Sequence, residues 1–222
     1  LVGDVMFGRW RGGRYHRYQN ERILAAYQQR IAPRALALAN LESAVCSRAE
    51  ARGVERPERA IALTASADRL DALRQVGVDV ASVANNHAID CGGDSLATTA
   101  SALADRGIQA VGSARRPTVT LRSGEVGVVV LGVSVHAPRL SVDADVPFPN
   151  LASRHRFERV VDRVHRLRRR NAEDVLVVSI HWGHEGAAEP SAWQRVRARR
   201  LVAAGADVIH GHGSHTVQPV EQ

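Results

Sequence analysis

The chain has 222 residues, of which 45% are hydrophobic and 24% charged, an ordinary composition for a globular protein that buries a full core. Its formal net charge of +7 comes entirely from arginine, since the sequence contains no lysine. No apolar run approaches the roughly 20 residues of a membrane-spanning helix, and no zinc-finger spacing or RNA-binding signature is present. We therefore expect no transmembrane segment in this chain and no nucleic-acid partner.

Strand-like and helix-like segments alternate along the chain, which is typical of an α/β fold. The first half predicts a strand over residues 1–5, a helix over 21–31 that leads past Pro33 to 35–41, and a polar loop through Pro57. A helix that Ser66 can cap and that ends at Gly77 follows, and it leads into a strand over 78–84.

The second half predicts a hairpin and then a further alternation of helices and strands. The expected order is a helix from Asp94 or Ser95 to Gly107, strands over 118–121 and 126–135 around Ser123-Gly124, a Pro-rich loop, a helix over 154–170, a strand over 175–180, a helix over 191–204 and a strand over 207–209. Because hairpin strands are antiparallel, we expect the sheet to be mixed.

The most arginine-rich stretch reads as an amphipathic helix with a solvated basic face. Its apolar residues recur at helical spacing, and they are Phe157, Val160, Val161, Val164 and Leu167. Glu158 and Asp162 stand among the arginines of the opposite face, so attraction of an anionic partner is the second interpretation of this surface.

Cys46 and Cys91 fit neither a disulfide scaffold nor a paired-cysteine zinc motif, because the sequence contains no C-x-x-C. We expect two free thiols.

Residues with metal-binding side chains follow, or end, several predicted strands. They are Asp4, Asn40, Glu42, Asn86, His87, His181, His212 and His215. In open α/β sheets ligands bind at this edge, so the set predicts one site. Imidazole nitrogens together with carboxylate and amide oxygens suit zinc, manganese or iron, and two such ions could hold a phosphoryl group and activate water.

Other candidate residues weigh less. Gly92-Gly93 is more typical of a turn than of a phosphate loop, and Ser134 and Ser179 lack a nucleophile-elbow setting. Met6 and Trp182 are interpreted as packing residues, with Trp182 also a candidate for lining a substrate pocket.

Five ordered motifs make the chain resemble the CapA family, which is named for poly-γ-glutamate capsule synthesis and is related to the calcineurin-like metallophosphoesterases. The motifs are Gly3-Asp4-Val5-Met6, Asn40-Leu41-Glu42, Ala84-Asn85-Asn86-His87-Ala88-Ile89-Asp90, His181-Trp182-Gly183-His184-Glu185, and Gly205 through His215 with Gln218-Pro219-Val220-Glu221 after it. The resemblance implies a single domain over residues 1–222 with a calcineurin-like sandwich of two mixed β-sheets flanked by helices. It also implies truncation at the C-terminus, where relatives continue into another strand.

Carried over by position, the resemblance implies a ligand set and several roles. The metal ligands would be Asp4, Glu42, Asn86, His181, His212 and His215. His87 would protonate a leaving oxygen, and Asp4 would also take part in catalysis. Asn40 would support Glu42 or contact substrate, with His184 and Trp182 nearby on the substrate side. The chain departs from the metallophosphoesterase pattern at Met6, which replaces a histidine, and from many CapA relatives at Gly213, for which His210 is a candidate replacement.

The function that follows is a metal-dependent hydrolase of the phosphoesterase type in capsule or poly-γ-glutamate biosynthesis, using manganese, iron or zinc. Its expected partners are an anionic polymer or peptide substrate and the capsule synthesis machinery. One alternative is a metal-independent peptide epimerase in which Asp4 and a histidine such as His212 form an acid–base pair. Another is a non-catalytic component of capsule assembly. The sequence assigns no compartment, because an N-terminal targeting segment or anchor would lie before Leu1.

Overall fold

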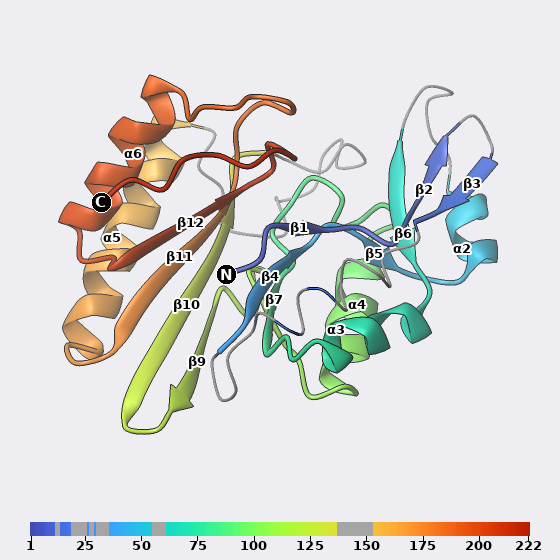
Figure 1. The fold of residues 1–222 in the computed structure, drawn as a ribbon, viewed down its shortest axis with the longest axis horizontal. Helices are drawn as coiled ribbons and strands as arrows, with labels where there is room; N and C mark the ends of the chain where they lie inside the picture. The colour runs from blue at the N-terminus through green and yellow to red at the C-terminus, as the bar shows by residue number, and fades with distance from the viewer. Residues whose placement is uncertain (12–13, 19–25, 27–28, 30–35, 55–60, 137–152) are drawn as a thin grey trace.

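The computed structural model describes residues 1–11, 14–18, 26, 29, 36–54, 61–136 and 153–222. Most of the expected helix over 21–31, the Pro-rich loop and the end of the polar loop at Pro57 lie outside these residues. The described part is a mixed α/β fold, as expected, but it has three sheets where the resemblance implied two (Figure 1).

The first sheet is parallel throughout and carries the N-terminal strand. Its order is β1 (Asp4–Val5), β4 (Leu38–Leu41), β7 (Val80–Ser82) and β8 (Gln109–Val111). The helices packed against it are η1 (Ala67–Leu70), α3 (Asp71–Gln75) and α4 (Ser95–Ala104). The buried cluster between sheet and helices includes Leu70, Leu73 and Leu103, the residues that helical spacing turns inward.

The second sheet is mixed, as the hairpin predicted. Its order is β12 (Val208–His212), β11 (Val175–His181), β10 (Val126–Ser134) and β9 (Thr118–Ser123), with only the β9–β10 pair antiparallel. Helices α5 (Arg154–Arg170) and α6 (Ala192–Ala203) cover its outer face (Figure 1). Strands β10 and β11 are rich in valine and almost fully buried, as expected for strands covered on both faces.

The first and second sheets share a core of their own. Leu38, Val80 and Val111 from the first sheet pack with Val119, Val130 and Val177 from the second. At one edge the backbones approach so closely that a Cβ built on Gly132 would lie 2.7 Å from the Cα of Gly112. The described elements thus stack as helices, sheet, sheet and helices.

The third sheet extends the molecule away from the α5 and α6 side (Figure 1). Its order is β3 (Arg14–Arg17), β2 (Gly8–Arg11), β6 (Ala62–Ala65) and β5 (Ala44–Val45), next to helix α2 (Arg48–Gly53). The predicted polar loop after Glu42 is therefore wrong, because β5 and α2 occupy it. Ser47 and Glu50 form a capping box that starts α2.

The prediction of two free thiols is also wrong. Cys46, which follows β5, and Cys91, which follows Asp90, form a disulfide with Cα atoms 6.2 Å apart. Sequence spacing gave no sign of this pairing, because the two cysteines meet only when β5 and the loop after β7 come together.

Helix α5 has the predicted amphipathic arrangement, although some of its arginines are partly buried. Phe157, Val160 and Val164 are buried against the second sheet. Arg168 does not lie free in solvent, since it donates hydrogen bonds to the carbonyl oxygens of Gly205 and Asp174 and pairs with Asp207. This arginine joins α5 to the segment that precedes β12. No helix within the described ranges is long and apolar enough to span a membrane.

Candidate metal centre

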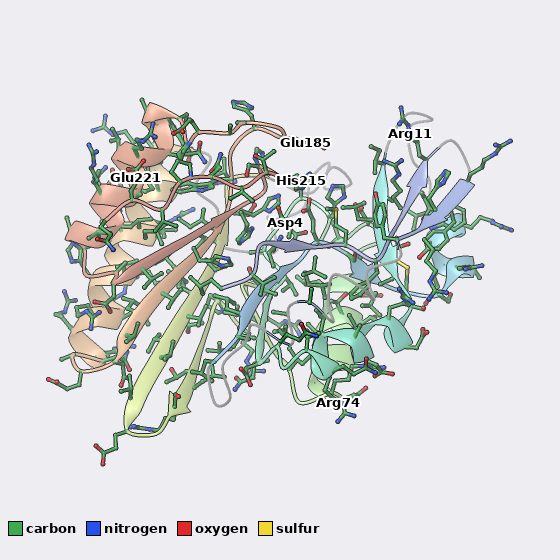
Figure 2. The ribbon with its side chains drawn as sticks, in the orientation of Figure 1. Asp4, Arg11, Arg74, Glu185, His215 and Glu221 are labelled. Atoms are coloured by element: carbon green, nitrogen blue, oxygen red, sulfur yellow. A yellow bond between two sulfur atoms is a disulfide. The ribbon has the colours of Figure 1, made fainter. Side chains whose placement is uncertain are left out.

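The predicted site residues meet where β1 and β4 of the first sheet face β11 and β12 of the second. Strand register sets their positions, because Asp4 pairs with Asn40 across β1 and β4 and His181 pairs with His212 across β11 and β12. Figure 2 shows Asp4 and His215 in the middle of the molecule, with Glu185 above them at the surface. Glu42 immediately follows β4 and is buried.

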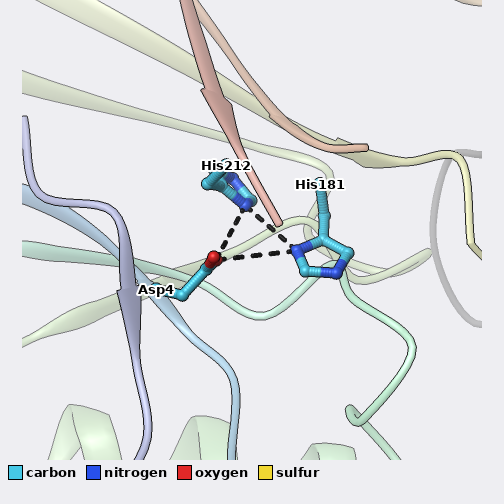
Figure 3. Close-up of side chains that lie close together, drawn as sticks. All are labelled: Asp4, His181 and His212. Carbon is cyan, nitrogen blue, oxygen red and sulfur yellow. Dashed lines mark hydrogen bonds and ion pairs between the residues drawn. The ribbon is translucent and has the colours of Figure 1, made fainter. Parts of the chain in front are cut away.

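One group of ligand atoms consists of a carboxylate oxygen and two imidazole nitrogens (Figure 3). Oδ1 of Asp4 lies 3.7 Å from Nδ1 of His181 and 3.4 Å from Nδ1 of His212, and the two nitrogens are 3.2 Å apart. Both histidine side chains are at most 3% exposed. The three atoms therefore converge on one point shielded from bulk solvent.

A second group uses the other oxygen of the same aspartate. Nε2 of His215 lies 3.7 Å from Oδ2 of Asp4 and 3.1 Å from Oε2 of Glu42. His215 has a φ of 55°, and it is the one non-glycine residue with positive φ in the described part of the chain. This conformation occurs in the turn after β12, and the ring reaches back to Glu42. Asp4 is thus shared between the two groups.

Hydrogen bonds fix the Asp4 carboxylate in this shared position. Asn40 donates from Nδ2 to Oδ1 at 2.8 Å, and the backbone N–H of Gly213 donates to Oδ2 at 2.8 Å. Asn85 in turn donates to Oδ1 of Asn40 and to the carbonyl oxygen of Leu41. Asn40 therefore supports Asp4, whereas the sequence interpretation had it supporting Glu42 or contacting substrate.

The charges of the site differ between the two groups. Burial raises the pKa of Asp4, but His181 and His212 outweigh it through hydrogen bonds and Coulomb attraction and hold the pKa well below its usual range. Burial lowers the pKa of His212. The hydrogen bond to Glu42 raises the pKa of His215 to about 9, against the effect of its partial burial. At neutral pH Asp4 is therefore ionised and His212 neutral, while His215 carries a proton.

His87 lies at the edge of the second group, and Asp90 contacts the ring nitrogen that faces away from the group. Its Nδ1 is 2.6 Å from Oδ2 of Asp90, and its Nε2 is 3.7 Å from Oε1 of Glu42. The backbone N–H of His87 donates to Oδ1 of Asn85. The ring thus presents Nε2 to the site and gives Nδ1 to a carboxylate, the arrangement that fixes the orientation of an imidazole.

Two buried residues, Ser179 and His210, lie on the side of His212 away from Asp4, where Ser179 contacts Nε2 of His212. The hydroxyl of Ser179 lies 3.1 Å from Nε2 of His212 and 3.2 Å from Nδ1 of His210. Burial lowers the pKa of His210 to about 3, so this ring is neutral. His210, the candidate replacement for a histidine at Gly213, belongs to neither ligand group among the described residues.

Five of the predicted site residues belong to neither group. Asn40 and His87 contact the groups as described above, whereas the other three do not take part in them. Asn86 is partly exposed, and its side chain makes no hydrogen bond within the part of the chain that the structure describes, whereas its neighbour Asn85 does. His184 is exposed. Trp182 is buried with the core of the second sheet and packs edge-on against Trp193, so its role here is packing.

Sequence reasoning missed His136, Asn85 and the roles of Asp90 and Ser179. His136 follows β10, and its Nε2 lies 3.2 Å from the carbonyl oxygen of Gly183, with its ring edge-on to His181. Its place directly after the valine-rich strand was the signal that would have found it.

The two groups fit divalent ions by both chemistry and spacing. Two ligands about 2.1 Å from a tetrahedral ion stand roughly 3.4 Å apart, and the distances from the histidine nitrogens to the other ligand atoms of their groups run from 3.1 to 3.7 Å. Histidine and carboxylate donors suit zinc, manganese or iron. The residues to hold such ions are Asp4, His181 and His212 in the first group, and Asp4, Glu42 and His215 in the second.

Comparison with known proteins gives a consistent set of relatives. The family model described as "Bacterial capsule synthesis protein PGA_cap" matches residues 1–222. A probable polyglutamine synthesis accessory protein of Mycobacterium tuberculosis is 32% identical over 168 residues, which are 69% of this chain and 44% of that protein. The capsule biosynthesis protein CapA of Bacillus anthracis is 25% identical over 98% of this chain and 54% of its own length. The PGA biosynthesis protein CapA of Bacillus subtilis is 24% identical over 100% of this chain and 58% of its own length. The chain thus spans about half the length of the curated relatives it matches.

Proposed function

The chain belongs to the bacterial capsule synthesis protein PGA_cap family, and from this premise and the site geometry we propose that it is a metal-dependent hydrolase of the phosphoesterase type. It acts in capsule or poly-γ-glutamate biosynthesis, the process named in its CapA relatives. The two face-to-face sheets between helices support a calcineurin-like sandwich as the architecture that carries this activity.

One observation carries the proposal: the two oxygens of Asp4 face two separate groups of ligand atoms. A carboxylate shared in this way is the feature needed to hold two ions side by side. Hydrogen bonds from Asn40 and Gly213 keep both oxygens in place. Divalent ions bound there would supply Lewis-acid chemistry, lowering the pKa of water and polarising a phosphoryl oxygen.

The residues of the chain itself supply the proton and the orientation. His87 directs Nε2 towards Glu42 and the second group, so a substrate bound there receives a proton at its leaving oxygen from this nitrogen. Asp90 accepts the hydrogen bond from Nδ1, which orients the ring. Burial of Glu42, His181 and His212 excludes bulk water from the interior side of the site.

The substrate we propose is an anionic polymer or peptide. The net charge of +7 favours diffusion of a polyanion towards the chain, an effect that weakens with salt. The names of the relatives refer to PGA, polyglutamine and capsule, and they support the proposal that the chain works beside the capsule synthesis machinery.

A metal-independent epimerase with Asp4 and His212 as acid and base is the second candidate. Their buried contact favours proton exchange between the two groups. However, an acid and a base on opposite faces of an α-carbon need to stand about 6 Å apart, twice the usual reach to a proton. Oδ1 of Asp4 and Nδ1 of His212 are 3.4 Å apart, which leaves no room for a carbon between them. The geometry therefore favours the hydrolase.

Hydrolysis of p-nitrophenyl phosphate by the purified chain, before and after chelation and after return of Mn²⁺ or Zn²⁺, tests the proposal. Chelation should abolish turnover and the ion should restore it. His87→Ala should lower kcat by roughly 10²–10⁴-fold, the range for loss of a proton donor. His165→Ala, which removes an exposed histidine on α5, is the matched control and should leave kcat unchanged.

Deuterium exchange at the α-carbons of a peptide, measured in parallel, separates the alternatives. Exchange that survives chelation and is lost in Asp4→Asn would establish the epimerase in place of the hydrolase. Tight ion binding without turnover in either assay would instead support a non-catalytic role in capsule assembly.

A further inference from the structure

A covalent cross-link joins the two chain segments that bring Glu42 and His87 together. The Cys46–Cys91 disulfide closes a sequence separation of 45 residues. Glu42 stands four residues before Cys46, and His87 stands four residues before Cys91. Nε2 of His87 lies 3.7 Å from Oε1 of Glu42, so the disulfide ties together the same two segments whose side chains meet in the site.

The segment that carries His87 has no helix or strand of its own to fix it. Residues 83–94, between β7 and α4, form turns, and side-chain contacts anchor them. Oδ2 of Asp90 accepts hydrogen bonds from Nδ1 of His87 and from the backbone N–H of Leu63 in β6, both at 2.6 Å. Cys91 is the next residue, so the disulfide restrains the backbone directly beside Asp90.

The remaining apolar packing around the disulfide is small. Cys46 is buried with Trp10, Ala51 and Ala62, and Cys91 packs against the same cluster. Two of these partners are alanines, and the cluster belongs to the third sheet, whose strands are short. Within the segment that carries His87, Ala84, Ala88 and Ile89 form a separate buried cluster with Leu96, and the cross-link adds a covalent anchor at the end of the segment next to Asp90.

We propose that the Cys46–Cys91 disulfide and Asp90 form a brace that positions His87 against Glu42, so that the reaction proposed above requires the oxidised chain. Cys46, Cys91 and Asp90 are positioning residues, and they act through His87. The effect on turnover rests on the proposed function, whereas the effect on the His87 ring does not. Reduction by a phosphine consumes one water, leaves two thiols and yields the phosphine oxide, and it releases the brace without changing any residue of the site.

The experiment follows the His87 ring and turnover in the same samples. Long-range ¹H–¹⁵N spectra of the metal-free chain, with the His87 signals assigned by their loss in His87→Gln, report which ring nitrogen carries the proton. The oxidised chain should show a protonated Nδ1, and tris(carboxyethyl)phosphine should shift this signal towards the mixed state of a free imidazole. The phosphine should also lower kcat for p-nitrophenyl phosphate roughly 10- to 100-fold with little change in KM. Displacement of a catalytic group by about 1 Å lowers the rate on this scale.

Two variants serve as controls. The Cys46→Ser/Cys91→Ser chain should show the reduced behaviour from the start and should not respond to the phosphine. Asp90→Asn keeps the disulfide and should also shift the ring signal and lower kcat, so it tests the brace even if the double variant does not fold. Circular dichroism establishes that each sample compared is folded.

The outcomes separate this inference from the proposed function. An unchanged His87 signal in the folded, reduced chain, or in Asp90→Asn, overturns the brace whether or not the chain hydrolyses phosphoesters. A shifted signal in a chain with no hydrolytic activity upholds the brace and sinks the hydrolase instead.

Discussion

Binding of a divalent ion to the second group should release a proton from His215. Binding of an ion to the first group should release none from Asp4 or His212. The hydrogen bond to Glu42 raises the pKa of His215 to about 9, so at pH 7 roughly 1% of metal-free chains have this ring neutral. An imidazole must be neutral to bind a metal ion. The apparent affinity of the second group should therefore rise about tenfold per pH unit below 9, or about 100-fold between pH 7 and 9.

The first group gives the internal comparison. Burial lowers the pKa of His212, and the pKa of Asp4 lies well below its usual range, so both are already in the form that binds an ion at pH 7. Titration calorimetry with Mn²⁺ in buffers of different ionisation enthalpy counts the protons released at each step. We expect about one proton at the second step, and His215→Gln should remove that step while leaving the first in place.

A rise in pH should weaken the folded state through His215, whereas it strengthens ion binding by the second group. Because the folded pKa of His215 lies above its unfolded value of about 6.5, the His215–Glu42 pair contributes its full stability below pH 6.5. That contribution is lost as pH rises through about 9. Urea unfolding of the metal-free chain should show this decline, and His215→Gln should not. In the calorimetry with Mn²⁺, equal proton release at both binding steps, or no release at the second step, would refute the assignment of the proton to His215.

The remaining predictions concern the shared carboxylate, the disulfide and the basic helix. Asp4→Asn should weaken the binding of both ions by roughly 100-fold or more in the same calorimetry, since loss of an outer partner alone costs 10–100-fold. Cys46→Ser/Cys91→Ser should lower the free energy of unfolding in urea by about 4 kcal/mol, the loop-entropy value for a separation of 45 residues. Arg168→Gln should cost about 1–3 kcal/mol because it strands several carbonyl oxygens, whereas Arg159→Gln on the exposed face should change stability by less than about 0.5 kcal/mol.

Elements with strong local patterns were predictable from the sequence. Strands β10 and β11 are runs of β-branched residues, and α5 places its apolar residues at helical spacing, so burial and periodicity agree. The β2–β3 hairpin and the two-residue β5 carry no such pattern. Strand β3 is arginine-rich and mostly exposed, and β5 forms only because β6 lies beside it. Their existence depends on tertiary pairing that no short window records.

The site was predictable to the level of segments but not of individual side chains. Parallel strands end at a common edge, so residues that follow different strands could be assigned to one site. Which of Asn85 and Asn86 turns inward is decided by the irregular turn after β7, where neither the helical nor the strand period applies. The left-handed conformation of His215, which aims its ring at Glu42, has the same origin in a turn.

The two groups are chemically unequal, and this difference bears on which ions they select. Strand β1 contributes only the Asp4 carboxylate to the two groups, and all their imidazoles come from β11, β12 and the turn after β12. The first group offers two imidazoles and one carboxylate oxygen, whereas the second offers one imidazole and two carboxylate oxygens. Nitrogen-rich sites favour zinc and oxygen-rich sites favour manganese, so an equimolar mixture of Zn²⁺ and Mn²⁺ should load zinc at the first group and manganese at the second. Anomalous scattering from crystals of the loaded chain, measured at the zinc and manganese absorption edges, would show which ion occupies each group, and the reverse assignment would contradict the order.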